Sequence, residues 1–369
     1  MLRIGVLGVG RPHASSSRRG TSLLRQLRAF PGVQVRAVCD LDAEALDRTQ
    51  REFEVPDAFT GLDDFLRAPV EAVVVATPAP LHAAHAIAAL RAGKHVACEV
   101  PAACSLEECA ALASAARTAG RVYSMLENYR YFAFIESWRA MVEGGLLGTP
   151  LYGEGEYIHD LRWQFTTAEG APAWRRAFPP LQYGTHALGP LLHVFADRCV
   201  RATALGTGPR LDPQAPVSDM EVALFQLAGG GVLKVVCGFA VIREPKSCYY
   251  SLYGTRGFVE TEREMEAGHP ESCRGYLEAM PHTRGLMRIP VGSDLPRPHG
   301  PPATWDGGGY PSRDHLALAQ FLAAVRGDAP PEIDLIRSLE FTAPCICAHM
   351  SAERGGVPVD VPDFRNPPR

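Results

Sequence analysis

The sequence predicts an α/β protein with an amino-terminal doubly wound parallel sheet, followed by an α/β substrate domain with a large, mainly antiparallel open sheet. Short apolar runs alternate with helical patterns over about the first 125 residues, as in parallel sheets with crossover helices. Later strands follow one another directly and are joined by glycine turns, which favours antiparallel pairing. These strands are expected at 221–227, 231–239, 248–253 and 257–261.

Length and composition fit two domains in one chain. The 369 residues exceed the usual size of a single domain, so we expect domains at 1–125 and 126–369. The formal net charge of -4 argues against a nucleic-acid or anionic-membrane partner. The ten cysteines stand in core-like contexts, which favours reduced thiols and no metal site. No signal-peptide pattern precedes the first strand, so we expect a cytoplasmic protein.

The first expected strand, at 3–10, ends in a glycine turn. Gly8 and Gly10 provide the first two glycines of a G-x-G-x-x-G pattern, where the backbone can approach a pyrophosphate. His13 stands in place of the third glycine, and the next helical pattern begins only near Thr21. The loop is therefore expanded and its phosphate contacts cannot be assigned. Taken alone, the pattern favours a plain structural turn over a phosphate-binding loop.

The second expected strand, 33–40, ends in Asp40. A carboxylate at this place accepts the ribose hydroxyls of an adenosine. Asp42 follows closely, and no basic pair is present to attract a 2'-phosphate, which favours NAD over NADP. The alternative is that Asp40 only caps the next turn.

Two further strands end in polar residues. The strand at 72–76 is followed by Thr77 and Pro78, and His82 opens a helix at 83–92. A strand near 94–98 leads into Glu99, and Ser105 with Glu108 forms a capping box for a helix at 105–120. Ligands of doubly wound sheets lie beyond the carboxyl ends of the strands. His82 is either a cofactor contact or a helix-start histidine.

In the second domain we expect a helix at 134–144 and a strand at 151–162 that carries a polar and aromatic cluster. On a continuous strand, His159 would share one face with Leu161, and Asp160 would share the other with Arg162. Aromatic faces and charged groups of this kind suit sugar hydroxyls, although an Asp–Arg pair on a solvent face is the alternative. The candidate substrate-binding residues are Tyr157, His159, Asp160, Arg162 and Trp163.

A second cluster contains the candidate catalytic residues Tyr183 and His186. They stand three positions apart at the start of a predicted helix, so both can point toward one ligand. Histidine titrates near neutral pH, which suits a general base, and Tyr183 could relay the proton. The alternative is a buried histidine bonded to a backbone carbonyl. The chain closes with expected helices at 314–325 and 338–353, after a glycine- and proline-rich loop at 292–309.

These motifs resemble those of the Gfo/Idh/MocA oxidoreductase family over almost the whole chain. The segment 94–102, KHVACEVPA, resembles the family's Glu-Lys-Pro segment, with Val100 in place of the lysine that helps to move the proton. HDLR at 159–162, YGTHALGP at 183–190 and PVDVPDF at 358–364 resemble glycoside hydrolase family 109, a branch of NAD-dependent alpha-N-acetylgalactosaminidases. Departures from that branch include Gly184 and Ala187 and the altered glycine loop.

The resemblance implies an amino-terminal Rossmann domain with NAD as cofactor, a carbohydrate substrate and a homo-oligomer, either dimer or tetramer. It extends the cofactor contacts to Asn128 and Arg130, and it places Thr77, Pro78 and His82 on the nicotinamide side. The implied reaction is redox-assisted glycoside cleavage with His186 and Tyr183 moving the protons. A simple sugar or cyclitol dehydrogenase and a non-catalytic regulatory protein, which Val100 favours, remain open.

Overall fold

The computed structural model describes residues 1–10, 19–167, 169–243, 246–263, 272–280, 285–290 and 312–366. His13 and the stretch 292–309 lie outside the described residues. The chain divides into two compact units, with segments 163–175 and 301–339 grouped with the amino-terminal one. The sequence predicts one boundary, after residue 125, which would place both segments in the second domain. In the structure they belong to the first unit. The units are Met1–Glu127, Trp163–Arg175 and Pro301–Leu339, and then Asn128–Arg162, Arg176–Gly300 and Glu340–Arg369.

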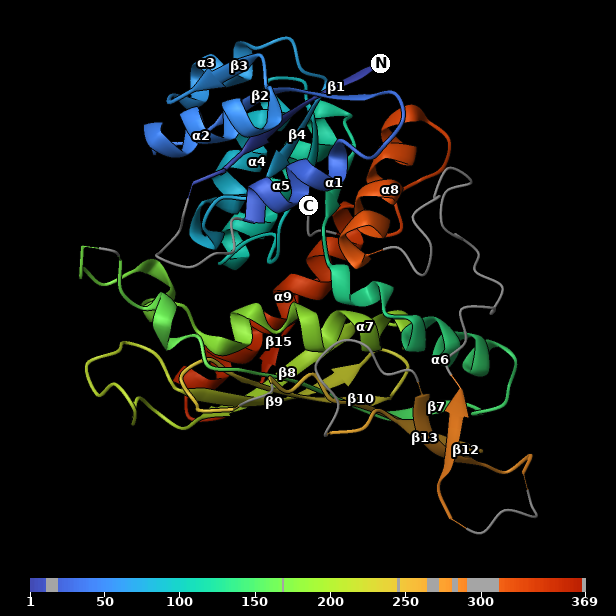
Figure 1. The fold of residues 1–369 in the computed structure, drawn as a ribbon. Coiled ribbons are helices and arrows are strands. Elements are labelled where there is room, and N and C mark those ends of the chain that lie inside the picture. The colour runs from blue at the N-terminus through green and yellow to red at the C-terminus, as the bar shows by residue number, and fades with distance from the viewer. Residues whose placement is uncertain are drawn as a thin grey trace. The chain divides into compact units, whose positions relative to one another are not determined.

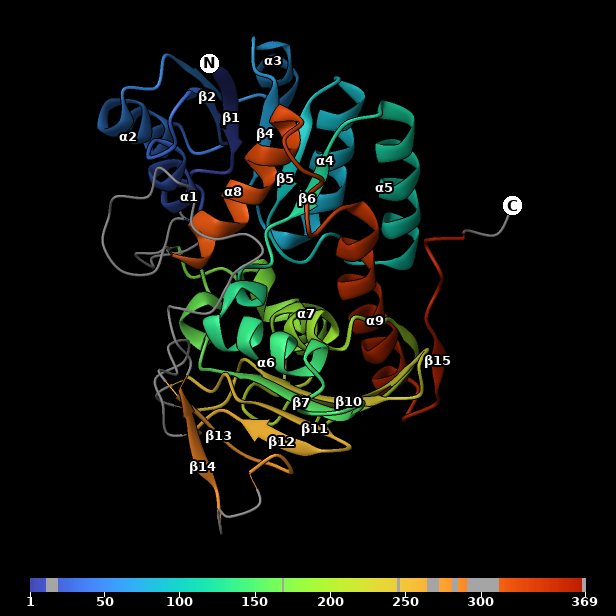
Figure 2. The same ribbon diagram turned by 90° about the vertical axis from the view of Figure 1, so that its right-hand side faces the viewer.

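A six-stranded parallel sheet forms the centre of the first unit (Figures 1 and 2). Its order, β3-β2-β1-β4-β5-β6, is that of a doubly wound sheet, which confirms the expected fold class. β4 is buried throughout, as the apolar run in a parallel strand predicts. The strands are β1 (Leu2–Leu7), β2 (Val33–Cys39), β3 (Asp57–Phe59), β4 (Ala72–Val75), β5 (His95–Cys98) and β6 (Tyr123–Met125).

The helices of this unit come from both ends of the chain: α1 (Arg19–Leu27), α2 (Ala43–Phe53), α3 (Leu62–Arg67), α4 (His82–Arg91), α5 (Leu106–Ala119) and α8 (Arg313–Arg326). α5 begins as predicted, since the Ser105 hydroxyl accepts the Glu108 amide at 3.1 Å. The Glu108 carboxylate accepts the amide of Cys104, one residue before the position that a standard capping box uses. α8 packs against α1, and the ring of His315 stacks on Phe30 with centroids 4.1 Å apart.

Gly20 takes over the packing role of the missing third glycine. A Cβ on this residue, the second of α1, would lie 1.8 Å from the carbonyl oxygen of Gly8. Gly8 itself has a φ of +95°, and a Cβ there would lie 2.7 Å from the backbone of Ala76 and Thr77. Three backbone segments therefore meet without side chains between them. The expanded loop moves the third glycine further along the sequence but keeps its function of close helix–strand packing.

The second unit is built on a nine-stranded mixed sheet with the order β14-β13-β12-β11-β7-β10-β9-β8-β15. β7 and β10 pair in parallel and the other neighbours pair antiparallel, which confirms the mainly antiparallel prediction. The strands are β7 (Pro150–Ile158), β8 (Cys199–Gly206), β9 (Met220–Leu227), β10 (Val232–Gly238), β11 (Tyr250–Gly254), β12 (Gly257–Glu260), β13 (Ser272–Leu277), β14 (Met287–Pro290) and β15 (Val359–Asp360).

Helices lie along one face of this sheet (Figure 1): α6 (Ala133–Glu143), α7 (Thr185–Phe195) and the part of α9 (Leu335–Glu353) that belongs to the second unit. Gly155 of β7 allows α7 to approach closely, because a Cβ there would lie 2.5 Å from the Ala187 carbonyl oxygen. Along β9, buried Ala223 and Phe225 alternate with exposed Val222 and Leu224. Within the described residues, no helix is both long and apolar enough to span a bilayer.

Replacing Gly20 with alanine is expected to destabilise the first unit by about 2 kcal/mol or more, because the methyl group overlaps the Gly8 carbonyl. The midpoint of urea unfolding measures the loss. Gly61→Ala is the matched control, since its nearest neighbour, an oxygen of Asp64, would lie 3.6 Å from the new Cβ. Equal unfolding midpoints for the two variants would show that α1 does not depend on this contact.

Candidate functional site

Asp40, immediately after β2, binds the glycine turn that follows β1. Its Oδ2 accepts the amides of Val9, at 2.7 Å, and Gly10, and its Oδ1 accepts the amide of Asp42 at 2.9 Å. A side chain at Gly10 is excluded, since a Cβ would lie 2.6 Å from Oδ1. Among the described residues, Oδ1 accepts this one amide, and a carboxylate oxygen can accept two hydrogen bonds. The carboxylate is thus held in place and retains capacity for a ribose hydroxyl.

His82 lies between two backbone carbonyls. Its Nδ1 lies 2.8 Å from the oxygen of Pro101 and its Nε2 lies 2.7 Å from the oxygen of Thr77. Burial lowers the pKa of the ring, although both carbonyls favour the charged form. Both ring nitrogens are therefore engaged by backbone, an arrangement that favours the structural alternative for His82. Thr77, followed by Pro78 at the carboxyl end of β4, has its hydroxyl 3.0 Å from Nδ1 of His85.

Glu99 follows β5 directly and is only 7% exposed. Its Oε1 accepts from Nε of Arg19 at 2.8 Å, and Arg19 begins α1. The neighbouring Val100 is also buried. Arg19 is a site residue that the sequence reasoning missed, because its contact depends on the return of the chain from the altered loop to the sheet.

The donor set of the first unit fits a dinucleotide. Gly8, Asp40, Thr77 and Glu99 follow β1, β2, β4 and β5, so they lie at the same edge of the parallel sheet. The carboxyl edge is where doubly wound sheets bind nucleotides. Asp40 would hold the adenosine ribose, and the glycine turn leaves space for a backbone contact with phosphate.

In the second unit, an aromatic cluster surrounds His186. Its imidazole is 6% exposed and stacks on Tyr129 with ring centroids 4.2 Å apart. The rings of Tyr157 and Tyr183 lie 5.0 and 5.1 Å away. The four residues come from η2 (Asn128–Tyr131), β7, η5 (Pro180–Tyr183) and α7. The structure thus brings together both predicted catalytic residues and Tyr157, which was expected to bind substrate.

Polar groups complete this cluster. Nε2 of His159 lies 3.2 Å from the Tyr157 hydroxyl, and the ammonium of Lys246 donates to the Tyr129 hydroxyl at 3.4 Å. The sequence reasoning missed Tyr129 and Lys246. The aromatic run at 129–132 was a usable signal for the tyrosine, but a lone lysine between two strands provides none.

Asp160, Arg162 and Trp163 do not form the expected faces of a strand. That prediction is wrong because β7 ends at Ile158 and Arg162 begins a short 3₁₀ helix. The Arg162 guanidinium instead binds Asp160, with Nη2 2.7 Å from Oδ2, and these hydrogen bonds lower the pKa of the carboxyl group. The pair corresponds to the alternative interpretation, an Asp–Arg pair on a solvent face, and 41% of the Arg162 side chain is exposed. Trp163 is 52% exposed and belongs to the first unit.

Asn128 and Arg130, predicted as cofactor contacts, lie in the second unit. Arg130 is buried, forms an ion pair with Glu136 and places its guanidinium 4.8 Å from the ring centre of Tyr131. These contacts within the second unit account for the burial of Arg130. Its role as a cofactor contact stays a prediction.

The fold and the first-unit residues define the class of protein: an NAD-binding, dehydrogenase-type enzyme. Residues 2–127 match the Gfo/Idh/MocA model, described as oxidoreductase family, NAD-binding Rossmann fold. A glycosyl hydrolase family 109 protein of Saccharopolyspora erythraea is 31% identical over 98% of this chain and 83% of its own. The chain therefore belongs to the Gfo/Idh/MocA oxidoreductase family and, within it, to glycosyl hydrolase family 109.

Two further proteins are similar over nearly the full length. The alpha-N-acetylgalactosaminidase of Bacteroides fragilis is 25% identical over 99% of this chain and 92% of its own. The solved structure of an inositol dehydrogenase homolog from Azotobacter vinelandii, complexed with NADH and myo-inositol, has a TM-score of 0.76. It is 22% identical, with 97% of each chain covered, and supports the fold. The predictions of an NAD-dependent enzyme and of its family are thus confirmed.

Replacing Asp40 with asparagine is expected to weaken NADH binding about tenfold, because a charge-assisted acceptor for the ribose is lost. The ratio of the NADPH to the NADH dissociation constant is expected to fall, because the variant has no carboxylate to repel a 2'-phosphate. Nucleotide fluorescence titration measures both affinities.

Asp42→Asn is the matched control, because Asp42 caps α2 through its side chain and asparagine caps equally well. Unchanged NADH affinity in the Asp40 variant would remove this residue from the cofactor contacts.

Proposed function

We propose that the protein is an NAD-dependent enzyme that transfers hydride at a hydroxyl carbon of a carbohydrate within a redox-assisted glycoside-cleavage cycle. The observation that carries the proposal is the burial of His186 among Tyr129, Tyr157 and Tyr183. Membership of glycosyl hydrolase family 109 supports the cleavage cycle over other reactions of the fold.

Bound NAD supplies the acceptor, and later the donor, of the hydride. His186 accepts the proton of the sugar hydroxyl, for which an imidazole is suited near neutral pH. Tyr183, next to it, relays or donates a proton to an alkoxide. The tyrosine rings around His186 also limit the access of water to the proton transfer.

Oxidation of the sugar hydroxyl at C3 of the pyranose ring gives a ketone, which acidifies the neighbouring C–H bond at C2. A base removes that proton, and the substituent at C1 leaves by elimination. Water then adds and the hydride returns, so the net reaction is hydrolysis. This cycle requires no pair of carboxylates on either side of the glycosidic bond, unlike ordinary glycosidases.

The test is incubation of the enzyme with chromogenic N-acetylhexosaminides and other glycosides while absorbance is followed at the NADH band. Chromophore release without net NADH is expected from the cleavage cycle. Steady NADH production would indicate a simple sugar or cyclitol dehydrogenase, and cofactor binding with neither signal would indicate a regulatory protein. His186→Ala is expected to lower turnover by 10²-fold or more, roughly the value of a general base, while NADH still binds. Near-normal turnover would exclude His186 from the mechanism.

We also propose that the protein is a homo-oligomer that pairs through the sheet face turned away from α7. Glu154 and Glu156 lie on this face because they alternate with Gly153 and Gly155, whose hydrogens point toward α7. Lys234 and Leu224 are paired across the neighbouring strands. Leu205, Val222, Leu224 and Tyr253 are each at least 40% exposed, which is unusual for so many large apolar side chains on one surface.

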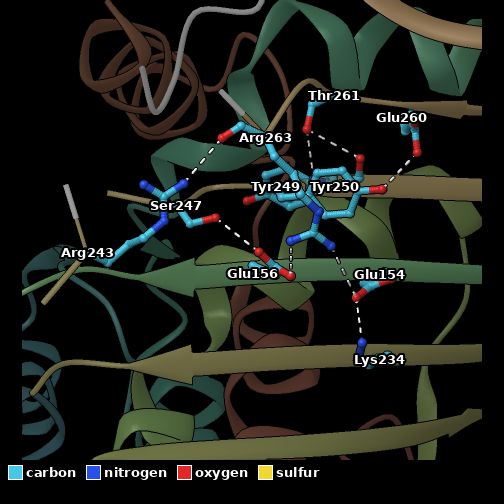
Figure 3. A network of polar contacts seen from close by, with 10 residues as sticks. All are labelled: Glu154, Glu156, Lys234, Arg243, Ser247, Tyr249, Tyr250, Glu260, Thr261 and Arg263. Atoms are coloured by element: carbon cyan, nitrogen blue, oxygen red, sulfur yellow. Dashed lines mark hydrogen bonds and ion pairs between the residues drawn. The ribbon is translucent and has the colours of Figure 1, made fainter. Parts of the chain in front are cut away.

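A polar network occupies part of the same face (Figure 3). Arg263 forms an ion pair with Glu156 at 2.6 Å and lies 3.9 Å from the ring centre of Tyr249, whose hydroxyl donates to Glu260 at 2.9 Å. Lys234 pairs with Glu154 at 2.6 Å. Lys234 and Arg263 each pair with a carboxylate of the same chain, so a second copy that covers these two ion pairs leaves neither cation without its partner.

Leu224→Glu is expected to convert the oligomer into monomers, because the new carboxylate would be buried without a partner. Light scattering coupled to size-exclusion chromatography measures the mass. Leu211→Glu is the matched control, since both leucines are 49% exposed and Leu211 lies outside the sheet. An unchanged mass for the Leu224 variant would exclude this face as the interface.

A further inference from the structure

Glu221 is a buried acid that the proposed mechanism does not use. It stands in β9 and is 1% exposed. Its Oε2 accepts the amide of Leu181 at 2.8 Å, and Nδ1 of His349 lies 2.8 Å from its Oε1. Both contacts lie within the second unit, and they join η5, β9 and α9, which are far apart in the sequence.

His349 holds this carboxylate from α9. The side chain of His349 is 13% exposed, and its Nε2 lies 3.6 Å from Oε1 of the exposed Glu353. Although burial opposes the charged form of the ring, the hydrogen bond to Glu221 and the charges of Glu221 and Glu353 raise the pKa of His349. A buried carboxylate is stable where a cation pairs with it and further donors bind its oxygens. The pair therefore fixes the Glu221 carboxylate in one position.

The Leu181 amide is the first donor of the η5 turn. Pro179 caps the turn and Pro180 begins it, and neither proline has an N–H group. The first amides of a helical turn have no acceptor within it. Leu181 is 0% exposed, so an amide here needs an acceptor from the protein. Glu221 supplies that acceptor.

The same turn carries Tyr183 and leads into α7. Tyr183 is the last residue of η5, and the next residue, Gly184, donates its amide to the Leu181 carbonyl at 2.8 Å. A Cβ on Gly184 would lie 2.8 Å from that same oxygen, so the turn is tightly closed. The Tyr183 ring lies 5.1 Å from that of His186. The position of Leu181 therefore influences where the phenol lies beside the imidazole.

We infer that Glu221 and His349 are positioning residues that hold Tyr183 beside His186. Glu221 fixes the first amide of the turn, and His349 fixes the carboxylate of Glu221. The inference rests on the proposed role of Tyr183 as the residue that relays or donates a proton. Because proton transfer requires hydrogen-bond geometry, a displaced phenol lowers turnover even where the fold is retained.

Fluorine NMR of the full-length protein, labelled with fluorotyrosine, tests the inference without any substrate. The Tyr183 resonance is identified by its loss in Tyr183→Phe. Glu221→Ala removes the acceptor of the Leu181 amide and is expected to change the chemical shift of this resonance. Tyr253, which is 40% exposed in β11, is the internal control, and its resonance is expected to stay unchanged.

Glu221→Gln is the matched variant. The oxygen of a glutamine side chain can accept the Leu181 amide, and its nitrogen can donate to Nδ1 of His349. We therefore expect the Tyr183 resonance to return to its position in the unmodified protein. An unchanged Tyr183 resonance in Glu221→Ala would overturn the inference. Equal shifts of the Tyr183 and Tyr253 resonances, or no recovery in Glu221→Gln, would show a merely structural role and also overturn it.

His349→Ala and His349→Asn form a second pair, which decides by the same criteria if Glu221→Ala does not fold. Asparagine keeps a side-chain nitrogen near the place of Nδ1, and alanine does not. Alanine is expected to shift the Tyr183 resonance and asparagine to leave it in place. Glu353→Gln is the control at the other ring nitrogen and is expected to cause no shift, because Glu353 is 66% exposed.

Turnover of the chromogenic N-acetylhexosaminides gives a second readout. The kcat is expected to fall about tenfold or more in Glu221→Ala and to recover in Glu221→Gln, while the affinity for NADH stays unchanged. A normal kcat in Glu221→Ala would overturn the positioning role. Absence of chromophore release from the unmodified protein would contradict the proposed function alone, since the fluorine resonances are measured without substrate.

Discussion

Three backbone segments of the first unit meet with no room for side chains between them, and the cofactor edge depends on this contact. The backbone at Gly8 lies close to Gly20 on one side and to Ala76 and Thr77 on the other. Neither glycine therefore has space for a side chain. This contact holds the start of α1 against β1 and β4. It thereby fixes where the glycine turn points, where Asp40 meets the turn amides, and where Arg19 leaves α1 toward Glu99.

In the second unit a corresponding constraint acts through the sheet. Gly153 and Gly155 allow α7 to lie close to β7, and α7 carries His186 at its start. The opposite face of the same strand carries Glu154 and Glu156. One strand therefore serves two purposes: its glycines seat the helix that bears the candidate base, and its acids contribute to the face proposed for oligomer formation.

The electrostatics of the two units differ in a way that suits their proposed tasks. At the carboxyl edge of the first sheet, charged side chains pair with one another, as Arg19 does with Glu99. Around His186 the neighbours are aromatic rings with hydroxyl groups, and Lys246 contributes an ammonium through Tyr129. The side chain of Val100 provides neither a charge nor a hydrogen bond. The proposed proton transfer therefore depends on the residues around His186.

The sequence by itself determined the alternation of strands and helices in the first unit, the parallel and mainly antiparallel sheets, the acid at Asp40 after the second strand, and the pairing of Tyr183 with His186. These features follow from local periodicity, glycine turns and motif spacing, which short-range physics controls. Only the tertiary structure decided the role of Gly20, the return of α8 to the first unit and the two carbonyl contacts of His82. It also decided the contact of Arg19 with Glu99 and the place of Tyr157 beside His186. Asp160 and Arg162 also belong here, because β7 ends before them. Each of these depends on contacts between residues far apart in the chain, or on where pairing stops, and no local pattern encodes such distances.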